Sequence, residues 1–341
     1  MAADGVMLLQ GDEVDELLMG QETAILEAVK QAYQTHARQQ TDMPPDGFLR
    51  FPGKERERII AKVAYLGGDF DVAGIKWVSS FPGNLELGLE RASAALILNS
   101  TETGRPMAMM ESSIISARRT GAGAALAARH LYPQEQVTSV ALVDCGLINF
   151  ETLRFLLTVY PMLETVHLYD LSAERAQQFC RKAQQLAPKV RCEIQATFEA
   201  VLKTSPIVAM ATTAVTPHID DLAGHQDHAV VLHTSLRDFS PQLILQGDNI
   251  VDDVDKVCSN QTSVHLAEEQ VGHRNFIRST IGDILNGDAP QHDTTKPFVI
   301  YSPFGLGILD IAVAHVTYQL AKTQQAGIFL ESFLPKSWLE R

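Results

Sequence analysis

The sequence is poor in cysteine, and the few cysteines that it has are scattered. No C-x-x-C spacing occurs among Cys145, Cys180, Cys192 and Cys258. Zinc sites and the disulfide frameworks of small secreted proteins need closely patterned cysteines, so the sequence indicates neither. We therefore interpret the four residues as reduced thiols.

Long hydrophobic runs are also missing. The apolar segments, such as residues 207–210 and 229–232, are far shorter than the roughly 20 residues that a membrane-spanning helix needs. Residues 1–18 have no basic start and soon turn acidic, unlike a secretory signal peptide. We therefore expect a cytoplasmic protein with no membrane partner.

Positive charge is scarce as well. The chain has 28 Lys and Arg against 41 Asp and Glu, a formal net charge of −13. Nucleic-acid binding needs a concentrated basic surface, which argues against a nucleic-acid partner. An anionic ligand would have to be held by a few local cations against an unfavourable overall field.

The histidine spacing does not match a metal site. The candidates that lie closest in the sequence are His218, His225, His228 and His233. Catalytic zinc usually has three well-placed protein ligands, and these positions fit neither H-E-x-x-H nor a comparable pattern. We expect no metal.

What the sequence does have is a pattern of alternating strands and helices. Its 341 residues suffice for about two domains, and 45% of them are hydrophobic, which is typical of a globular protein. Helical periodicity covers 22–39, a strand-rich region covers 58–111, and 116–131 forms a helix of small residues. From Val137 onward, apolar strands alternate with helices, and a last helix covers 307–322. The pattern predicts an α/β fold with a parallel sheet covered on both faces.

One strand-turn-helix segment has the form of a dinucleotide-binding loop. The segment VALVDCGLINFETL, residues 140–153, places Asp144, Gly146 and Asn149 at the three positions of a G-x-G-x-x-G fingerprint. Gly146 holds the middle position, where the backbone must approach a pyrophosphate closely. We expect the loop still to bind a dinucleotide, though weakened by the carboxylate of Asp144.

A carboxylate follows the next predicted strand. Asp170 can accept hydrogen bonds from the adenosine ribose and repel a 2′-phosphate, which favours NAD over NADP. The alternative interpretation is that Asp170 and Ser172 only cap the following helix. From this segment alone, both interpretations stay open.

Several stretches together resemble the ornithine cyclodeaminase and mu-crystallin family, in the order that the family uses. These stretches are GIKWVSSFPGN (74–84), the long run from RASAALILN to LAARHL (91–131), VDCGLINFETL, SLRDFSP (235–241) and SPFGLGILDIAVA (302–314). They span nearly the whole chain. The motifs RAS, LILN, ETG and GLINFETLRFL resemble those of the family branch that makes 2,3-diaminopropionate for siderophores and peptide antibiotics. Asn149 is unremarkable in that branch, whereas Asp144 departs from the family pattern.

The resemblance implies both an activity and an architecture. Enzymes of this branch oxidise N-(2-amino-2-carboxyethyl)-L-glutamate with NAD and release L-2,3-diaminopropionate and 2-oxoglutarate. A Rossmann-type NAD-binding domain would cover residues 125–304. An α+β domain from residues 1–124 and 305–341 would bind the substrate, an amino acid with several carboxylates, and would form the contact of a homodimer.

The resemblance also implies the site residues. Substrate carboxylates would be bound by Arg50, Lys76 and Arg119, with Arg91 as a weaker additional candidate. Arg118 adjoins Arg119, but the family places its arginine directly before threonine. Contacts to the cofactor would come from Thr120, Gly146, Leu147, Ile148, Asn149, Asp170, Thr212 and Thr213.

Asp238, in SLRDFSP, matches the catalytic aspartate of the family, and Lys76 would join it at the reacting centre. Asp238 could take a proton from the amine and assist water attack on the imine, especially if burial raises its pKa. The competing interpretation makes it a turn residue before a helix that has Ser240 as N-cap and Pro241 at its first position.

Two other functions fit the same resemblance. An ornithine cyclodeaminase-like or ketimine reductase-like enzyme would share the fold and the cofactor. A mu-crystallin-like ligand-binding protein would keep the fold with weakened cofactor binding, and Asp144 motivates this alternative.

Overall fold

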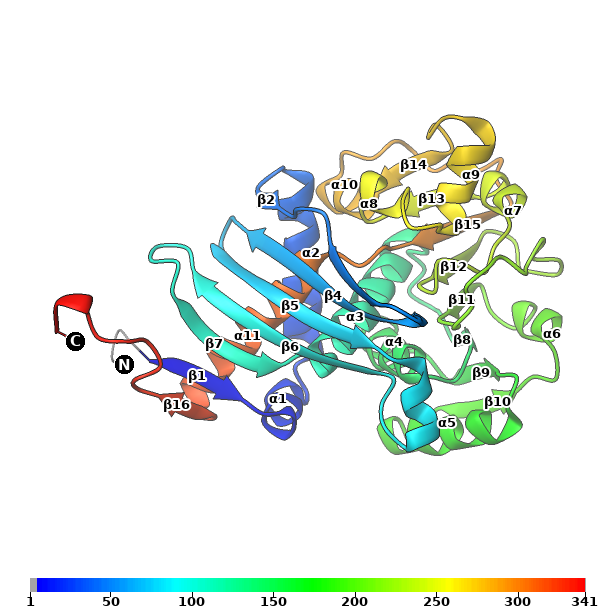
Figure 1. Ribbon diagram of the computed structural model, residues 1–341. Coiled ribbons are helices and arrows are strands. Elements are labelled where there is room, and N and C mark those ends of the chain that lie inside the picture. Colours follow the sequence, from blue (N-terminus) through cyan, green and yellow to red (C-terminus); the bar gives the residue numbers. More distant parts are fainter. Residues whose placement is uncertain (1–4, 341) are drawn as a thin grey trace. The chain divides into compact units, whose positions relative to one another are not determined.

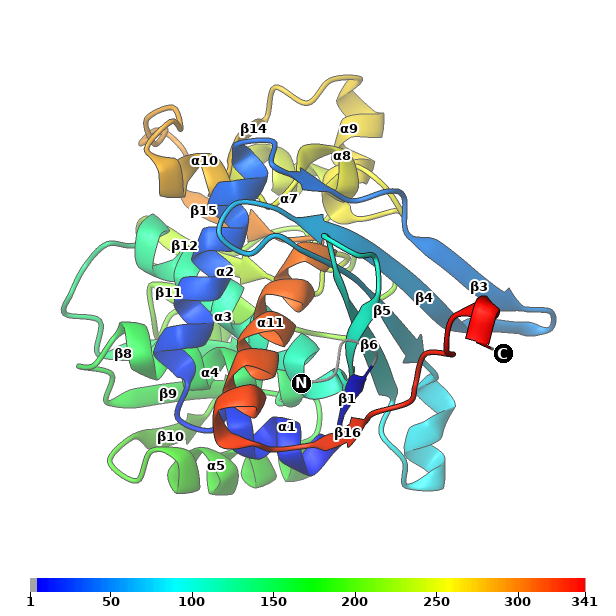
Figure 2. The same cartoon turned by 90° about the vertical axis from the view of Figure 1, so that its left-hand side faces the viewer.

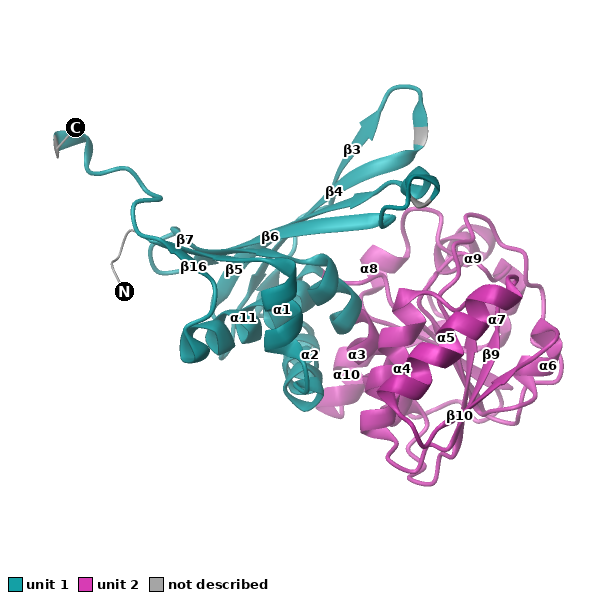
Figure 3. Ribbon diagram, turned by 90° about the horizontal axis from the view of Figure 1, so that it is seen from below, with its two compact units in different colours: residues 1–119, 307–341 teal, residues 120–306 magenta. Residues whose placement is uncertain are grey.

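The computed structural model describes residues 5–340, with only the backbone of Glu55, Leu85 and Glu340. The chain divides into two compact units, unit 1 (Met1–Arg119 and Gly307–Arg341) and unit 2 (Thr120–Leu306) (Figure 3). The divisions fall within helix α3 (Ser113–Leu131) and at the start of helix α11 (Gly307–Gln324). The sequence predicted divisions a few residues away, after 124 and after 304.

Unit 1 is built on one mixed sheet with the strand order β16-β1-β7-β6-β5-β4-β2, and β3 pairs with β4 (Figure 1). Strands β4 to β7 form an antiparallel meander. The strands are β1 (Val6–Leu9), β2 (Thr41–Asp42), β3 (Gly47–Phe51), β4 (Lys54–Leu66), β5 (Val72–Ser80), β6 (Ala92–Ser100), β7 (Pro106–Glu111) and β16 (Ile328–Leu330). A 3₁₀ helix, Pro82–Leu87, links β5 to β6, and another, Trp338–Glu340, lies near the end of the chain.

Helices cover one face of this sheet (Figure 2). They are α1 (Gly11–Leu18), α2 (Glu22–Ala37) and α11, and α2 confirms the helix expected from residue 22. The covered face of β5 carries Gly74 and Lys76. A Cβ at Gly74 would lie 2.8 Å from Cδ1 of Ile311, so the missing side chain lets α11 pack closely on the sheet.

Unit 2 contains a fully parallel sheet with the order β10-β9-β8-β11-β12-β15-β13-β14. The strands are β8 (Ser139–Val143), β9 (Thr165–Tyr169), β10 (Arg191–Ile194), β11 (Ile207–Met210), β12 (Ala229–His233), β13 (Asp248–Val251), β14 (Ile277–Thr280) and β15 (Phe298–Ser302). The central strands are buried along their whole length, as a parallel sheet covered on both faces requires. The predicted α/β class is confirmed.

The helices of unit 2 connect successive strands. They are α4 (Leu147–Val159), α5 (Ala173–Leu186), α6 (Phe198–Leu202), α7 (Pro241–Gln246), α8 (Val254–Val257), α9 (Ser263–Val271) and α10 (Ile281–Asn286), together with the larger part of α3. The expected caps are confirmed, because Ser172 caps α5 and Ser240 caps α7 with Pro241 in its first turn.

The strand order defines where a ligand can bind. Starting from β8, the chain turns first to β9 and β10 on one side and then crosses to β11 and β12 on the other. In such Rossmann-type sheets, the ligand lies outside the carboxyl ends of the strands at this reversal. The segments after Val143, Met210 and His233 all leave the sheet at that edge.

Candidate functional site

The first part of the candidate site is a buried group of charges in unit 1. Lys76 on β5 and Arg119 on α3 both bind Asp310 of α11, with distances of 2.7 Å from Nζ to Oδ2 and 3.0 Å from Nε to Oδ1. Ser116, one turn before Arg119, accepts a hydrogen bond of 2.9 Å from Lys76 Nζ. Two of the predicted substrate cations are therefore in one cluster, and sequence reasoning missed the carboxylate that joins them.

The electrostatics of this cluster leave an excess of positive charge. Burial lowers the pKa of Lys76 to about 7, although the carboxylate of Asp310 acts in the opposite direction. Burial also acts to raise the pKa of Asp310, but Arg119 and Lys76 outweigh it and hold this pKa below its usual value. With one carboxylate between two cations, the cluster suits a further carboxylate from a ligand.

The other two predicted cations lie further along the same sheet. Arg50 on β3 is exposed, with its guanidinium 5.6 Å from the ring centre of Phe48. Arg91 is exposed before β6 and donates a 3.0 Å hydrogen bond from Nη1 to Oγ of Ser80.

Strand register relates these two arginines through a residue that the sequence analysis did not select. Arg58 of β4 stands opposite Arg50 on one side and opposite Ser80 of β5 on the other. Opposed residues in an antiparallel sheet project from the same face, so the side chains of these residues are neighbours. Arg50, Arg58 and the Arg91–Ser80 contact thus form a row of cationic side chains, which we call the arginine row.

The candidate dinucleotide-binding loop of unit 2 is the turn between β8 and α4. Asp144 adopts φ +76°, so an aspartate takes the left-handed conformation that glycine normally supplies at the first fingerprint position. Gly146 precedes α4, and a Cβ there would lie 2.9 Å from Oδ1 of Asp144. Asn149 is fully buried, and its amide donates 2.7 Å hydrogen bonds to the carbonyls of Val143 and Asp144. Asn149 therefore fixes the turn from within.

The carboxylate of Asp144 does not stand alone. Burial raises its pKa to about 6, against the opposing effect of Arg175, whose Nη2 lies 3.2 Å from Oδ1. The carboxylate also accepts a hydrogen bond from the backbone N–H of Gly146. Partial protonation and this ion pair both reduce the repulsion of phosphate that the sequence analysis expected from a free carboxylate.

Asp170 directly follows β9, as predicted. Its carboxylate accepts hydrogen bonds from the N–H groups of Cys145, at 2.8 Å, and Ser172, at 2.7 Å. Arg175 lies 3.6 Å away. Asp170 thus joins the glycine turn to the start of α5, a structural role that leaves the proposed ribose contact untested.

The other predicted cofactor residues lie at the carboxyl edge of the unit 2 sheet or on adjoining helices. Leu147, at the start of α4, is 56% exposed. Ile148 follows it in α4 and Thr120 lies in α3, both partly buried. Thr212 and Thr213 follow β11, and Thr213 is exposed.

Asp238 lies in the loop between β12 and α7, five residues after the strand. The side chain is fully buried, and its carboxylate accepts hydrogen bonds from the hydroxyls of Thr212 and Ser235. His233, the last residue of β12, is also fully buried and lies 3.1 Å from Oδ2 through Nε2, stacked on the ring of Phe239. Each carboxylate oxygen therefore has a partner within unit 2.

These partners overturn the expected pKa of Asp238. Burial alone would raise it, as the sequence analysis supposed, but hydrogen bonds from His233, Ser235 and Thr212 outweigh burial and lower the pKa to about 2. Hydrogen bonds to the charged form of a carboxylate stabilise that form. Asp238 is therefore an anion throughout the physiological range, and two of its hydrogen-bond donors, Thr212 and Ser235, are residues that are only partly buried.

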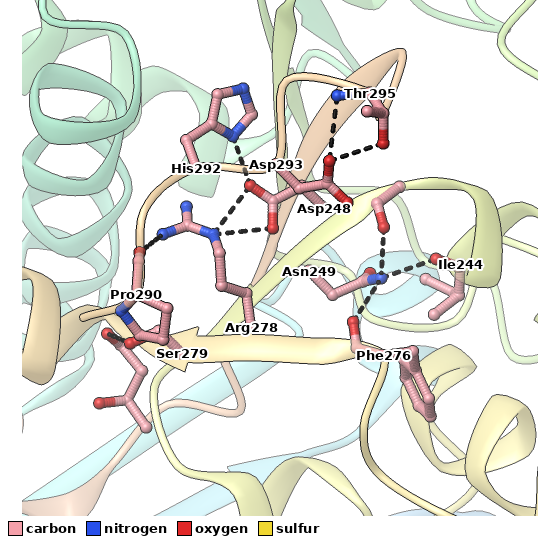
Figure 4. Close-up of polar contacts among 12 residues, drawn as sticks. Ile244, Asp248, Asn249, Phe276, Arg278, Ser279, Pro290, His292, Asp293 and Thr295 are labelled. Atoms are coloured by element: carbon pink, nitrogen blue, oxygen red, sulfur yellow. Dashed lines mark hydrogen bonds and ion pairs between the residues drawn. The ribbon is translucent and has the colours of Figure 1, made fainter.

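A second polar cluster, at the amino end of β13, has a structural explanation (Figure 4). Asp248 is buried and binds Nε of Arg278 at 2.8 Å and Nδ1 of His292 at 2.6 Å. The neighbouring Asn249 donates to the carbonyls of Ile244 and Phe276. Ligands of such sheets bind at the opposite, carboxyl edge, so this cluster fastens β13 to its surroundings.

The described residues 5–340 also bear on the metal and membrane expectations. No group of three or more His, Cys, Asp or Glu in this range is placed to hold a metal ion. Within the same range, no helix combines the length and the apolar character needed to cross a membrane.

The sequence matches the profile of the ornithine cyclodeaminase/mu-crystallin family over residues 5–325, and the chain belongs to this family. It is 27% identical to the N-((2S)-2-amino-2-carboxyethyl)-L-glutamate dehydrogenase of Staphylococcus aureus, over 96% of this chain and 99% of the relative. It is also 27% identical to the alanine dehydrogenase of Archaeoglobus fulgidus, over 96% and 98%. These relatives are dehydrogenases of amino acids and their derivatives.

Solved structures of similar fold agree with this membership. The Δ1-pyrroline-2-carboxylate reductase of Thermococcus litoralis, solved with NADH and L-proline, aligns with a TM-score of 0.86 at 21% identity, covering 95% of this chain and 99% of that one. An archaeal alanine dehydrogenase dimer with bound NAD aligns with a TM-score of 0.84 at 24% identity, covering 96% and 100%. The fold of the chain is thus that of NAD-binding enzymes in this family.

Proposed function

We propose that this protein is an NAD-dependent oxidoreductase of CH–NH bonds that oxidises N-(2-amino-2-carboxyethyl)-L-glutamate to L-2,3-diaminopropionate and 2-oxoglutarate. The observation that carries the proposal is the buried cluster of Lys76, Arg119 and Asp310, two cations that share one carboxylate. Similarity to the Staphylococcus aureus enzyme over nearly the whole chain supports this reaction above others. Unit 1 binds the substrate, and unit 2 binds NAD.

The residues of the glycine turn fit a dinucleotide. Gly146 leaves space for the backbone to approach a pyrophosphate, and α4 directs its free N–H groups and partial positive charge at the same place. Thr120, Leu147, Ile148 and Thr212 contribute the surrounding surface, with Thr213 beside them. NAD bound there would supply the hydride acceptor for oxidation of the substrate Cα–N bond, and hydrolysis of the resulting imine would release the two products.

Lys76 and Arg119 hold the carboxylate next to the reacting Cα. A carboxylate bound there is oriented by a guanidinium fork and neutralises the surplus charge of the cluster. Lys76, with its pKa near 7, exchanges a proton in the range in which an amine and a carbinolamine must gain or lose one.

Asp238 supplies a fixed negative charge for the reaction. As an anion with a pKa of about 2, it is a weak base by itself, and the hydroxyls of Thr212 and Ser235 lie between it and the outside. We infer that water attack on the imine is assisted through these hydroxyls, with Asp238 as the fixed negative charge that polarises them. His233 keeps the carboxylate in place.

The arginine row supports a substrate with several carboxylates. N-(2-amino-2-carboxyethyl)-L-glutamate has three, and the cluster at Lys76 accounts for one of them. Ser80 lies four residues along β5 from Lys76, about 13 Å at the usual rise per strand residue, and arginine side chains reach back over part of that distance. We assign the distal carboxylates to Arg50 and Arg91, together with Arg58.

The test is a comparison of substrates. The protein is mixed with NAD and N-(2-amino-2-carboxyethyl)-L-glutamate, and NADH absorbance and 2-oxoglutarate are followed together. L-alanine, L-ornithine and L-proline serve as alternatives. Equal yields of NADH and 2-oxoglutarate from the tricarboxylate support the proposal. Formation of proline and ammonia from ornithine would indicate a cyclodeaminase. Oxidation of NADH when a cyclic imine is supplied would indicate a ketimine reductase. NAD binding without turnover of any substrate would favour a mu-crystallin-like binding protein.

The remaining parts of the proposal concern context. We propose a cytoplasmic homodimer that supplies a siderophore or peptide antibiotic precursor. The open face of the unit 1 sheet supports the dimer, because Leu49, Val63, Tyr65 and Trp77 are each 37–45% exposed there. Register places all four on the face opposite Lys76, away from α11.

A further inference from the structure

Arg175 is a cation in an unusual place. It occupies the first turn of α5, where the helix dipole disfavours positive charge, so the helix does not stabilise the charge of its guanidinium. Its guanidinium instead turns toward the glycine turn, where Nη2 lies 3.2 Å from Asp144 Oδ1 and Nε lies 3.6 Å from Asp170 Oδ2. Nη2 is also 3.6 Å from the point that a Cβ of Gly146 would occupy. The guanidinium therefore lies directly beside the loop that receives the dinucleotide.

The charges around this loop require such a cation. Asp144 and Asp170 place two carboxylates around the glycine turn, and a pyrophosphate bound at this turn would add two negative charges. A side chain that only neutralised the carboxylates would be expected to be covered by them, yet Arg175 remains 49% exposed. A guanidinium has five N–H donors, and two contacts to carboxylates leave donors for a third anion.

We propose that Arg175 binds the pyrophosphate of the dinucleotide directly, held over the glycine turn by Asp144 and Asp170. The proposal rests on the NAD-binding function proposed above and adds a ligand that the G-x-G-x-x-G pattern does not contain. Asp144 supplies the left-handed turn in place of glycine and at the same time fixes the arginine. The loop thus combines backbone N–H groups with one side-chain cation.

The experiment measures dinucleotide binding by calorimetry, without any substrate. Arg175→Ala should weaken the binding of NAD and of ADP-ribose by about 10- to 150-fold, the range for loss of a charged hydrogen bond. Adenosine, which has no phosphate, should be unaffected. Arg181→Ala is the matched control, because it removes the same charge from an exposed position of the same helix.

A second background separates direct binding from charge neutralisation. In Asp144→Gly protein, Arg175→Ala should still weaken NAD binding by at least about tenfold. If its effect vanishes there, Arg175 only neutralises Asp144, and the proposal is wrong. A larger loss for NADP than for NAD would place the arginine at the 2′-phosphate and would also overturn it. If the parent binds NAD but Arg175→Ala binds it equally well, this inference alone fails; if the parent binds no NAD, the proposed function fails with it.

Discussion

Lys76 Nζ and Asp310 Oδ2 lie 2.7 Å apart in the interior of unit 1, with side chains 2% and 0% exposed. Because Arg119 uses the other oxygen of the same carboxylate, one buried anion serves two buried cations. Removal of a charged partner from such a site leaves unpaired charge in a medium of low polarity. The stability of unit 1 therefore depends on this arrangement, and the proposed binding of a substrate carboxylate depends on the same residues.

Asp310→Asn should destabilise the protein by about 3–5 kcal/mol, because two cations lose their buried partner. Urea denaturation followed by circular dichroism measures the change. Glu27→Gln is the control, since it breaks an exposed pair with Lys30 that is worth about 0–1 kcal/mol. Equal stability losses in the two variants would show that the cluster tolerates unpaired charge.

Substrate binding should weaken as the pH rises through about 7. Burial lowers the pKa of Lys76 to that value, so its ammonium is charged below pH 7 and increasingly neutral above it. The dissociation constant of the substrate, titrated in the presence of NADH, should therefore rise with pH in the parent. Lys76→Met should bind weakly and lose this dependence, whereas Lys30→Met, an exposed lysine in the same unit, should retain it. A pH dependence that persists in Lys76→Met would assign the titration to another group.

Asp238→Asn should retain NAD binding and lose activity by about 10² to 10³, the usual effect of removing one preorganised electrostatic group. The carboxylate is ionised above a pKa of about 2, so its own titration should not limit activity at pH 5 or above. Asp221→Asn, at an exposed loop position of unit 2, is the control for kcat. If the activity of Asp238→Asn stays within a fewfold of the parent, the catalytic role is wrong and Asp238 is a structural residue of the turn.

NAD should bind at least about tenfold more tightly than NADP, because a 2′-phosphate near Asp170 adds like-charge repulsion that salt only partly screens. Fluorescence titration with the reduced cofactors measures both affinities. Asp170→Asn should narrow the difference, mainly by improving the binding of NADPH. If the parent binds the two cofactors with equal affinity, Asp170 does not select between them, and its role is limited to the hydrogen bonds with Cys145 and Ser172.

Trp77→Glu should convert the proposed homodimer into a monomer, because it places a charge in the middle of the exposed apolar face. Light scattering coupled to size-exclusion chromatography determines the mass. Trp338→Glu provides the control, since Trp338 is 75% exposed and lies far along the chain in a 3₁₀ helix. A monomeric parent would disprove the dimer, and a dimeric Trp77→Glu would disprove this surface.

The elements of unit 2 were predictable because their signals are local. Alternation of apolar strands and helices predicted α4 and the caps at Ser172 and Ser240, and Gly146 identified the turn between β8 and α4. The family resemblance selected Lys76 and Arg119, which the structure brings together. These predictions depend on residues close together in the sequence or on sequence motifs, and a single sequence contains both.

The partners of those residues could not be predicted. Asp310 stands in an apolar helix near the end of the chain, and only tertiary packing brings it to Lys76. The sequence analysis considered only burial as an influence on the pKa of Asp238, because the hydrogen bonds from Thr212, His233 and Ser235 that lower it depend on the folded structure. Arg58 was missed because cross-strand register, which relates it to Arg50, is set by the pairing of β3 with β4.

The position of β15 has a consequence for how the chain folds during its synthesis. β15 is made after β13 and β14, yet it lies between β12 and β13 in the sheet. Until residues 298–302 leave the ribosome, β12 and β13 each present an unpaired edge, a state that invites wrong pairing with other chains. Unit 1 completes its fold later still, because α11 and β16 are synthesised last. Truncation before residue 298 should therefore yield insoluble protein, even though the proposed NAD loop is already complete by then.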